Sequence, residues 1–222
     1  MKSNLKIKKK HIKNSFGVDP KIKFVVGIDE VGRGPLAGPV AVCAFKMPIN
    51  FNSKAFGKIK DSKKLTPQKR EEIFDKLNII KKEGVIDYFV CYESAIRIDK
   101  IGLSKAIKNC LEKSIGKLKV TPEECLVLLD GGLKAPQIYK SQKTIIKGDE
   151  KERAIAFASI VAKVSRDALM CKLAKKYPKY SFEIHKGYGT KKHCEAIRKN
   201  GLCTEHRKSF CKFFLILRNH VA

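Results

Sequence analysis

The stretch FVVGIDEVGRGPLAGP, residues 24–39, decides how the rest of the chain is organised. Its first five residues, 24–28, are mostly apolar and β-branched, a pattern that predicts a buried strand. Two carboxylates, Asp29 and Glu30, follow directly, and a glycine-rich turn comes after them. Burying a charge without a partner is costly. The two acids therefore predict a partner such as a hard divalent cation, which prefers oxygen ligands.

Neighbouring side chains of a regular strand point to opposite faces of the sheet. Asp29 and Glu30 can share one site only if the strand breaks or twists between them. We therefore expect the backbone to leave regular strand geometry at one of these two residues, since the glycines beyond them make a break easy.

The turn at 32–38 differs from a dinucleotide-binding fingerprint in two ways. Its glycines have the spacing G-x-G-x-x-x-G, and the segment after it, 39–45, has the pattern of a strand where the fingerprint requires a helix. Its backbone N–H groups are instead a candidate cradle for a phosphate or a hydroxyl group.

The net charge restricts the kind of partner. The 222 residues include 48 basic and 22 acidic side chains, which gives a net charge of +26. Such a surplus favours a polyanion, either nucleic acid or an anionic membrane surface, and we rank nucleic acid ahead of a lysine-rich surface composition without a functional role. We find no signal peptide and no apolar run of membrane-spanning length, and the eight cysteines form no C-x-x-C pair. We therefore expect a cytoplasmic protein with free thiols and no membrane association.

One group of histidines and cysteines near the end of the chain comes closest to a zinc site. It consists of His193, Cys194, Cys203, His206 and Cys211. Its spacing fits no zinc-finger pattern, and we do not expect it to bind zinc.

Strands and helices alternate after an initial hairpin, which predicts an α/β fold with a mixed sheet. Thr66 followed by Pro67 predicts the start of a helix. The expected strands are 24–28, 39–46, 85–91, 125–129 and 144–146, and the expected helices are 67–80, 99–118, 151–176 and 210–217. We divide the chain into a basic N-terminal arm at 1–21, a main domain at 22–176 and a basic, partly helical region at 177–222.

Two further carboxylates occupy positions comparable to those of the first pair. Asp130 ends the apolar strand predicted at 125–129, and Asp149 precedes the long helix predicted at 151–176. Strand ends of an open α/β sheet converge on a functional crevice. Acids gathered there would repel one another without cations.

One or two Mg²⁺ or Mn²⁺ ions are natural partners for such acids, and two-ion sites serve in-line phosphoryl displacement. Together with the basic charge, the pattern indicates a nuclease. A basic nucleic-acid-binding protein without catalytic activity would explain the charge but not the acids. Asp149 taken alone could also be a helix N-cap.

Seven segments resemble, in order, the motif series of the bacterial ribonuclease HII family. They are GIDEVGRGPLAGPV (27–40), DSKKLT (61–66), LLDGG (128–132), KGD (147–149), ASIVAKVSRD (158–167), HKGYGTKKH (185–193) and EHRKSF (205–210). The resemblance implies a ribonuclease H-like catalytic domain with a five-stranded mixed sheet and flanking helices, plus a small C-terminal helical region that contributes to substrate binding. It implies an endonuclease that cuts the RNA strand of RNA–DNA hybrids and nicks duplex DNA on the 5′ side of a single ribonucleotide. The products would carry 3′-hydroxyl and 5′-phosphate ends.

By motif position, the resemblance implies four catalytic and metal-binding acids, which are Asp29, Glu30, Asp130 and Asp149. Asp167 competes with Asp149 for the fourth role, but it lies within a predicted helix beside Arg166, where an ion pair is the simpler interpretation. We expect Mg²⁺ or Mn²⁺ as the cofactor, with two ions during catalysis, and a monomeric enzyme.

The resemblance also implies residues that bind the substrate. The turn Gly32-Arg33-Gly34 would hold the ribonucleotide 2′-hydroxyl, the group that separates RNA from DNA at one position. Tyr188 would pack against the next deoxyribose, where an extra hydroxyl would be unfavourable. Candidate phosphate contacts are the basic residues Lys147, Lys186, Lys191, Lys192 and Arg207.

Overall fold

The computed structural model describes residues 19–57, 59 and 65–214. Its strands are β1 (Phe24–Val31), β2 (Val40–Pro48), β3 (Asp87–Glu93), β4 (Cys125–Asp130) and β5 (Gln142–Ile145). They form one five-stranded sheet in the order β3-β2-β1-β4-β5. β2 pairs antiparallel with β1 and β3, whereas β4 pairs parallel with β1 and β5. The sheet is therefore mixed, and the predicted α/β class is confirmed.

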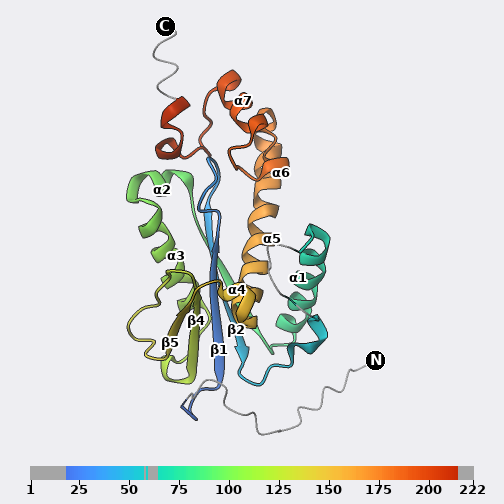
Figure 1. The fold of residues 1–222 in the computed structure, drawn as a ribbon, viewed down its shortest axis with the longest axis vertical. Helices are drawn as coiled ribbons and strands as arrows, with labels where there is room; N and C mark the ends of the chain where they lie inside the picture. The colour runs from blue at the N-terminus through green and yellow to red at the C-terminus, as the bar shows by residue number, and fades with distance from the viewer. Residues whose placement is uncertain (1–18, 58, 60–64, 215–222) are drawn as a thin grey trace.

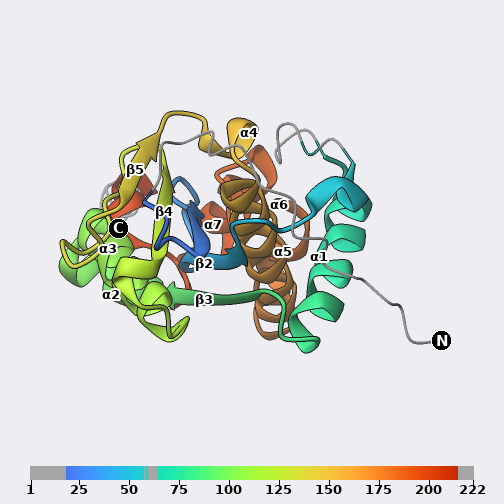
Figure 2. The same cartoon turned by 90° about the horizontal axis from the view of Figure 1, so that it is seen from below.

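Helices cover both faces of this sheet (Figures 1 and 2). The α-helices are α1 (Pro67–Lys82), α2 (Ala95–Ile101), α3 (Leu103–Lys117), α4 (Gly148–Lys151), α5 (Arg153–Lys176), α6 (Phe182–His185) and α7 (Lys191–Asn200). Short 3₁₀ helices are η1 (Ser53–Phe56), η2 (Pro122–Glu124), η3 (Pro178–Tyr180) and η4 (Lys208–Phe210). None of the described helices combines the length and apolarity needed to cross a membrane.

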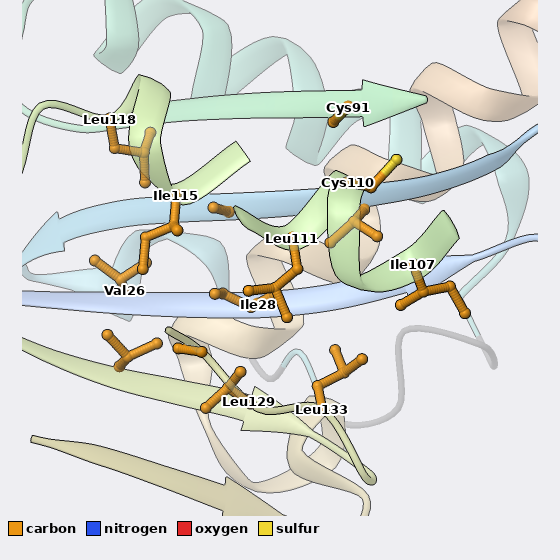
Figure 3. Close-up of a cluster of buried hydrophobic side chains, with 14 of the residues drawn as sticks. Val26, Ile28, Cys91, Ile107, Cys110, Leu111, Ile115, Leu118, Leu129 and Leu133 are labelled. Atoms are coloured by element: carbon orange, nitrogen blue, oxygen red, sulfur yellow. The ribbon is translucent and has the colours of Figure 1, made fainter. Parts of the chain in front are cut away.

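The alternation of side chains along β1 builds the two layers of the core. Val26 and Ile28 lie on one face, in a cluster with Leu111 and Ile115 of α3 (Figure 3). Val25 lies on the other face, in a cluster with residues of α5. This two-sided burial explains why the strand is apolar at nearly every position.

Two expected helices differ in extent in the structure. The helix expected at 99–118 is two helices, because Gly102 adopts a φ of +82° between α2 and α3. α2 begins after Ser94, whose hydroxyl accepts a hydrogen bond from Arg97 N at 3.2 Å. The helix expected at 151–176 begins at Arg153, because Glu152 is extended and separates it from α4.

The helix start at Thr66 is confirmed, since its hydroxyl accepts a hydrogen bond from Lys69 N at 3.2 Å and Pro67 follows it. Most of the arm predicted at 1–21 lies outside the described residues, and so does the end of the helix predicted at 210–217.

The segment after α5 packs against the turn that follows β1. A cluster of apolar side chains makes this contact, namely Ala37, Met170, Ala174, Tyr180, Phe182 and Ile197. In Figure 1, α6 and α7 accordingly lie at the same end of the sheet as this turn. The boundary that we drew between 176 and 177 stays a prediction.

Candidate active site

The first two acids lie in an unbroken strand. Asp29 pairs with Cys43 and Glu30 with Val42, in the same continuous register of β1 with β2. Our expectation that the backbone leaves strand geometry at one of them is therefore wrong. The pairing of β1 with β4 ends at Ile28, however, so the two strands part just before the acids.

Because the pairing of β1 with β4 ends before the acids, β1 does not have to break for both acids to lie near the end of β4. Asp29 and Glu30 point to opposite faces of β1. Burial is the main cause that raises the pKa of both carboxyls, and the charge of Asp130 at the end of β4 raises both further. The acids thus lie where the pairing of β1 with β4 ends, on opposite faces of β1 instead of sharing one face.

Asp29 is held firmly on the α5 face of the sheet. Its side chain is only 5% exposed, its Oδ1 accepts a hydrogen bond from Glu30 N at 2.7 Å, and Ser159 of α5 is a second side-chain partner. Burial raises the pKa of its carboxyl well above the usual range, and the neighbouring charge of Glu30 raises it further. A nearby cation would relieve both effects.

Glu30 is also destabilised as an anion. Burial raises the pKa of its carboxyl, and the guanidinium of Arg33, which donates to Oε1 at 3.0 Å, lowers it in part. The other oxygen, Oε2, is buried and accepts no hydrogen bond from any described residue. A buried carboxylate oxygen without a donor is an unusual and costly feature.

The KGD segment brings Asp149 to the end of β4. Gly148 N donates to Asp130 Oδ1 at 2.7 Å. A Cβ at Gly148 would lie 2.5 Å from Ile155 Cδ1 and 3.3 Å from Asp130 Oδ1, so a larger residue there would require the Ile155 side chain to move. Asp149 is buried within α4, and the N-cap of this helix is Lys147. The alternative of Asp149 as the N-cap is therefore wrong.

The four acids fit a divalent cation by donor type. All are carboxylates, the ligands that Mg²⁺ and Mn²⁺ prefer, and the orphaned Glu30 Oε2 offers a ready oxygen. Within the described part of the chain, no group of three or more histidine, cysteine or carboxylate side chains already has the arrangement of a formed metal site.

Asp167 has a different environment from the four acids. Its Oδ1 lies 2.9 Å from Lys163 Nζ, one turn earlier in α5. The ion-pair interpretation is therefore confirmed, although the partner is Lys163 and not Arg166.

Arg207, expected to contact phosphate, is completely buried, so that expectation is wrong. Its guanidinium donates to three main-chain oxygens of the turn, those of Gly32 at 2.7 Å, Arg33 at 3.0 Å and Gly38 at 3.0 Å. Burial lowers its pKa to about 10, so it stays charged at neutral pH.

Arg166 is a second buried arginine that sequence reasoning missed. It donates to the carbonyl oxygens of Pro39 at 2.9 Å, Lys186 at 3.0 Å and Ala37 at 3.3 Å. Its position within the mainly apolar middle of α5 was the signal that could have revealed it. The two arginines together bind the carbonyl groups at both ends of the turn, those of residues 32–33 and 37–39.

Tyr188 lies beside the glycine turn. A Cβ placed on Gly34 would be 3.9 Å from Tyr188 Cε1, and the tyrosine is 41% exposed. Leu36 N donates to Gly187 O at 2.8 Å and ties the two segments together. The structure thus brings together two predicted substrate-binding elements that are far apart in sequence.

The candidate lysines lie around these elements. Lys147 is exposed immediately before Gly148, and Lys186 is half-buried, with its ammonium donating to Glu183 O. Lys191 and Lys192 are exposed at the start of α7. Their contacts with phosphate stay predictions.

Comparison with known proteins gives a consistent result. The family model described as ribonuclease HII matches residues 26–213. The ribonuclease HII of Caldicellulosiruptor bescii is 44% identical over 209 residues, which cover 92% of this chain and 97% of that protein.

Solved structures share the fold. A chain in the PCNA:RNase HII complex from Archaeoglobus fulgidus superposes with a TM-score of 0.68 at 24% identity, covering 83% of this chain and 93% of that one. Bst-RNase HIII in complex with Mn²⁺ gives a TM-score of 0.66 at 19% identity, covering 88% of this chain and 70% of that one. The predicted ribonuclease H-like fold is therefore confirmed.

Proposed function

Because this chain belongs to the ribonuclease HII family and is a ribonuclease H, an endonuclease, we propose that four acids form its catalytic centre and bind divalent metal. These acids are Asp29, Glu30, Asp130 and Asp149. The observation that carries the proposal is their convergence. β1, β4 and the KGD segment each bring acids to the same end of the sheet, and the charge of Asp130 acts on both acids of β1.

The cofactor that we propose is Mg²⁺ or Mn²⁺, with two ions during catalysis. Bound there, such ions supply the positive charge that activates a water molecule and stabilises the leaving oxygen. The protein's part is to hold the ligands in place. Ser159 and the Glu30 N–H orient Asp29, while Gly148 N orients Asp130. Water adds to the phosphorus and the bond to the 3′ oxygen breaks, which leaves a 3′-hydroxyl and a 5′-phosphate.

We propose RNA–DNA hybrids and duplex DNA with single ribonucleotides as substrates, cut on the 5′ side of the ribonucleotide. The turn Gly32-Arg33-Gly34 would hold the 2′-hydroxyl, and Tyr188 would pack on the following deoxyribose. The proximity of Gly34 to Tyr188 supports this pairing, because adjacent nucleotides need adjacent contacts. Lys147 and Lys186 are proposed phosphate contacts.

A duplex DNA with one labelled ribonucleotide tests the proposal. With Mg²⁺ or Mn²⁺ we expect one nick on the 5′ side of the ribonucleotide, no cleavage of the all-DNA duplex, and no cleavage in EDTA. Asp29→Asn and Asp130→Asn should abolish the nick and leave duplex binding largely intact. Cleavage of the all-DNA duplex, or no nick with either metal, would refute the proposed substrate.

We also propose that the enzyme is a cytoplasmic monomer and that region 177–222 contributes to substrate binding. All eight cysteines are free thiols, which suits a reducing compartment. The exposed Lys191 and Lys192 lie close in sequence to Tyr188 and support the role of this region.

A further inference from the structure

We propose that Arg207 and His206 are positioning residues that hold the glycine turn and Tyr188 in fixed relation, so that the two can read a ribonucleotide together. The inference rests on the proposed function of the turn and of Tyr188. Neither residue is placed to touch the substrate, since both are buried.

The first arm of this device is Arg207, which determines where the turn directs its N–H groups. A trans peptide places its C=O and N–H in opposite directions. The carbonyl groups of Gly32 and Arg33 both point to Arg207. The N–H groups of Arg33 and Gly34, which belong to the same two peptides, must therefore point away from it.

The N–H groups of Arg33 and Gly34 form a pair of neighbouring donors, and both point away from Arg207. Neither donates a hydrogen bond to another group of the described chain. Two neighbouring donors that point outward can bind a hydroxyl or phosphate oxygen. Because the buried guanidinium of Arg207 binds the carbonyl oxygens, the N–H donors of the turn must face the side on which a ligand can bind.

The second arm connects His206 to Tyr188. His193 Nδ1 lies 2.9 Å from Tyr188 O, a pure acceptor, so this nitrogen must carry the proton. His193 Nε2 then accepts from His206 Nε2 at 3.1 Å, and His206 Nδ1 accepts from Cys203 N at 2.9 Å. Every ring nitrogen has a defined role, and both rings are neutral.

The two arms meet because their residues are adjacent in a short segment that docks on the turn. Arg207 N donates to Leu36 O at 2.8 Å, and Gly38 N donates to Glu205 O at 2.8 Å. Residues 205–207 therefore connect the turn, through these main-chain hydrogen bonds, with His193, through the side chain of His206. A displacement of residues 205–207 would change the distance between Gly34 and Tyr188.

The test is Arg207→Lys, which keeps the charge but cannot reach three carbonyl oxygens in the same geometry. The matched control is Arg97→Lys, an exposed arginine on α2, outside the region proposed to bind substrate. Binding in EDTA is measured to a duplex with one ribonucleotide and to the same duplex made of DNA only. We expect the control to keep the wild-type preference for the ribonucleotide. Arg207→Lys should lose about tenfold to a hundredfold of that preference, with its affinity for the all-DNA duplex unchanged.

A second variant examines the other arm. His206→Asn keeps an acceptor for Cys203 N but removes the contact with His193. We expect it to lower kcat/KM on the single-ribonucleotide duplex more than on a uniform RNA–DNA hybrid, because only the former places a deoxyribose against Tyr188. Equal losses on both substrates would indicate a purely structural role and overturn this arm.

The outcomes separate the two proposals. A wild-type protein without preference for the ribonucleotide contradicts the proposed function itself. A wild-type protein with that preference, together with a folded Arg207→Lys variant that retains it, overturns only the positioning role. Circular dichroism establishes folding. If Arg207→Lys does not fold, Arg207→Gln replaces it, because its amide can still donate to a carbonyl of the turn but cannot make the three hydrogen bonds of the guanidinium.

Discussion

Replacing Gly27 by alanine tests how closely α5 must pack on β1. A Cβ at this position would be placed 2.0 Å from the carbonyl carbon of Ala154, whereas ordinary contact begins at 3.4 Å. The obstacle is main chain of a helix, so no side-chain rotation can relieve it. α5 would have to move away by more than an ångström.

The expected cost follows from this displacement. Overpacking of a core costs about 1–3 kcal/mol when side chains can adjust, and here backbone must move, so we expect at least about 3 kcal/mol of lost stability. For a chain of this size that corresponds to a fall of roughly 6–12 °C in Tm. Asp29 lies two residues further along the same face and is bonded to Ser159 of α5, so nicking activity should fall as well.

Thermal unfolding by circular dichroism is the assay, with Gly116→Ala as the matched control. Gly116 lies within α3, and a Cβ there would meet nothing within 4 Å. The same glycine-to-alanine change should therefore stabilise the protein by up to about 1 kcal/mol, through helix propensity. A Tm for Gly27→Ala within about 2 °C of the wild type would refute the reasoning.

Three further predictions concern pH, the fourth acid and metal. Burial lowers the pKa of His193 and of His206 to about 4, below the value of about 6.5 in the unfolded chain, so the unfolded chain binds more protons between these values. The free energy of unfolding should fall from pH 7 to pH 5 by roughly 2 kcal/mol per histidine. Urea unfolding of the wild type and of His193→Gln separates this histidine effect from that of the buried acids of the active site, which act in the opposite direction. Equal pH dependence of the two proteins would contradict the prediction. Asp149→Asn should reduce nicking at least about a hundredfold, whereas Asp167→Asn, which removes only an ion pair with a lysine, should keep nearly full activity; the reverse result would reassign the fourth acid. Saturating Mn²⁺ should raise the Tm of the wild type, because at 100 times Kd it increases the free energy of unfolding by about 2.7 kcal/mol. A similar rise in Tm for Asp29→Asn would show that the ion binds elsewhere.

Local patterns in the sequence determined much of this protein. The apolar runs predicted all five strands of the sheet, and Thr66 with Pro67 predicted the start of α1. The position of Asp130 at the end of β4 also followed from its place after an apolar run. These features depend on residues within a few positions of one another, so periodicity and capping are enough to reveal them.

The spatial relation between the acids required the tertiary structure. Neighbouring side chains on an unbroken strand appeared unable to serve one site, and the sequence does not show that β4 parts from β1 after Ile28. Where a neighbouring strand leaves depends on the whole sheet, and no local pattern encodes it.

The environment of the arginines likewise required the fold. Arg207 lies in a basic segment and has the sequence context of a surface residue, yet it is fully buried against carbonyl groups of a turn about 175 residues earlier. A cation can be buried only where the fold supplies enough acceptors, and those acceptors are main-chain oxygens that every residue type carries. The sequence by itself therefore predicted the residues that we propose to carry the chemistry, whereas the tertiary structure alone decided which buried groups surround them.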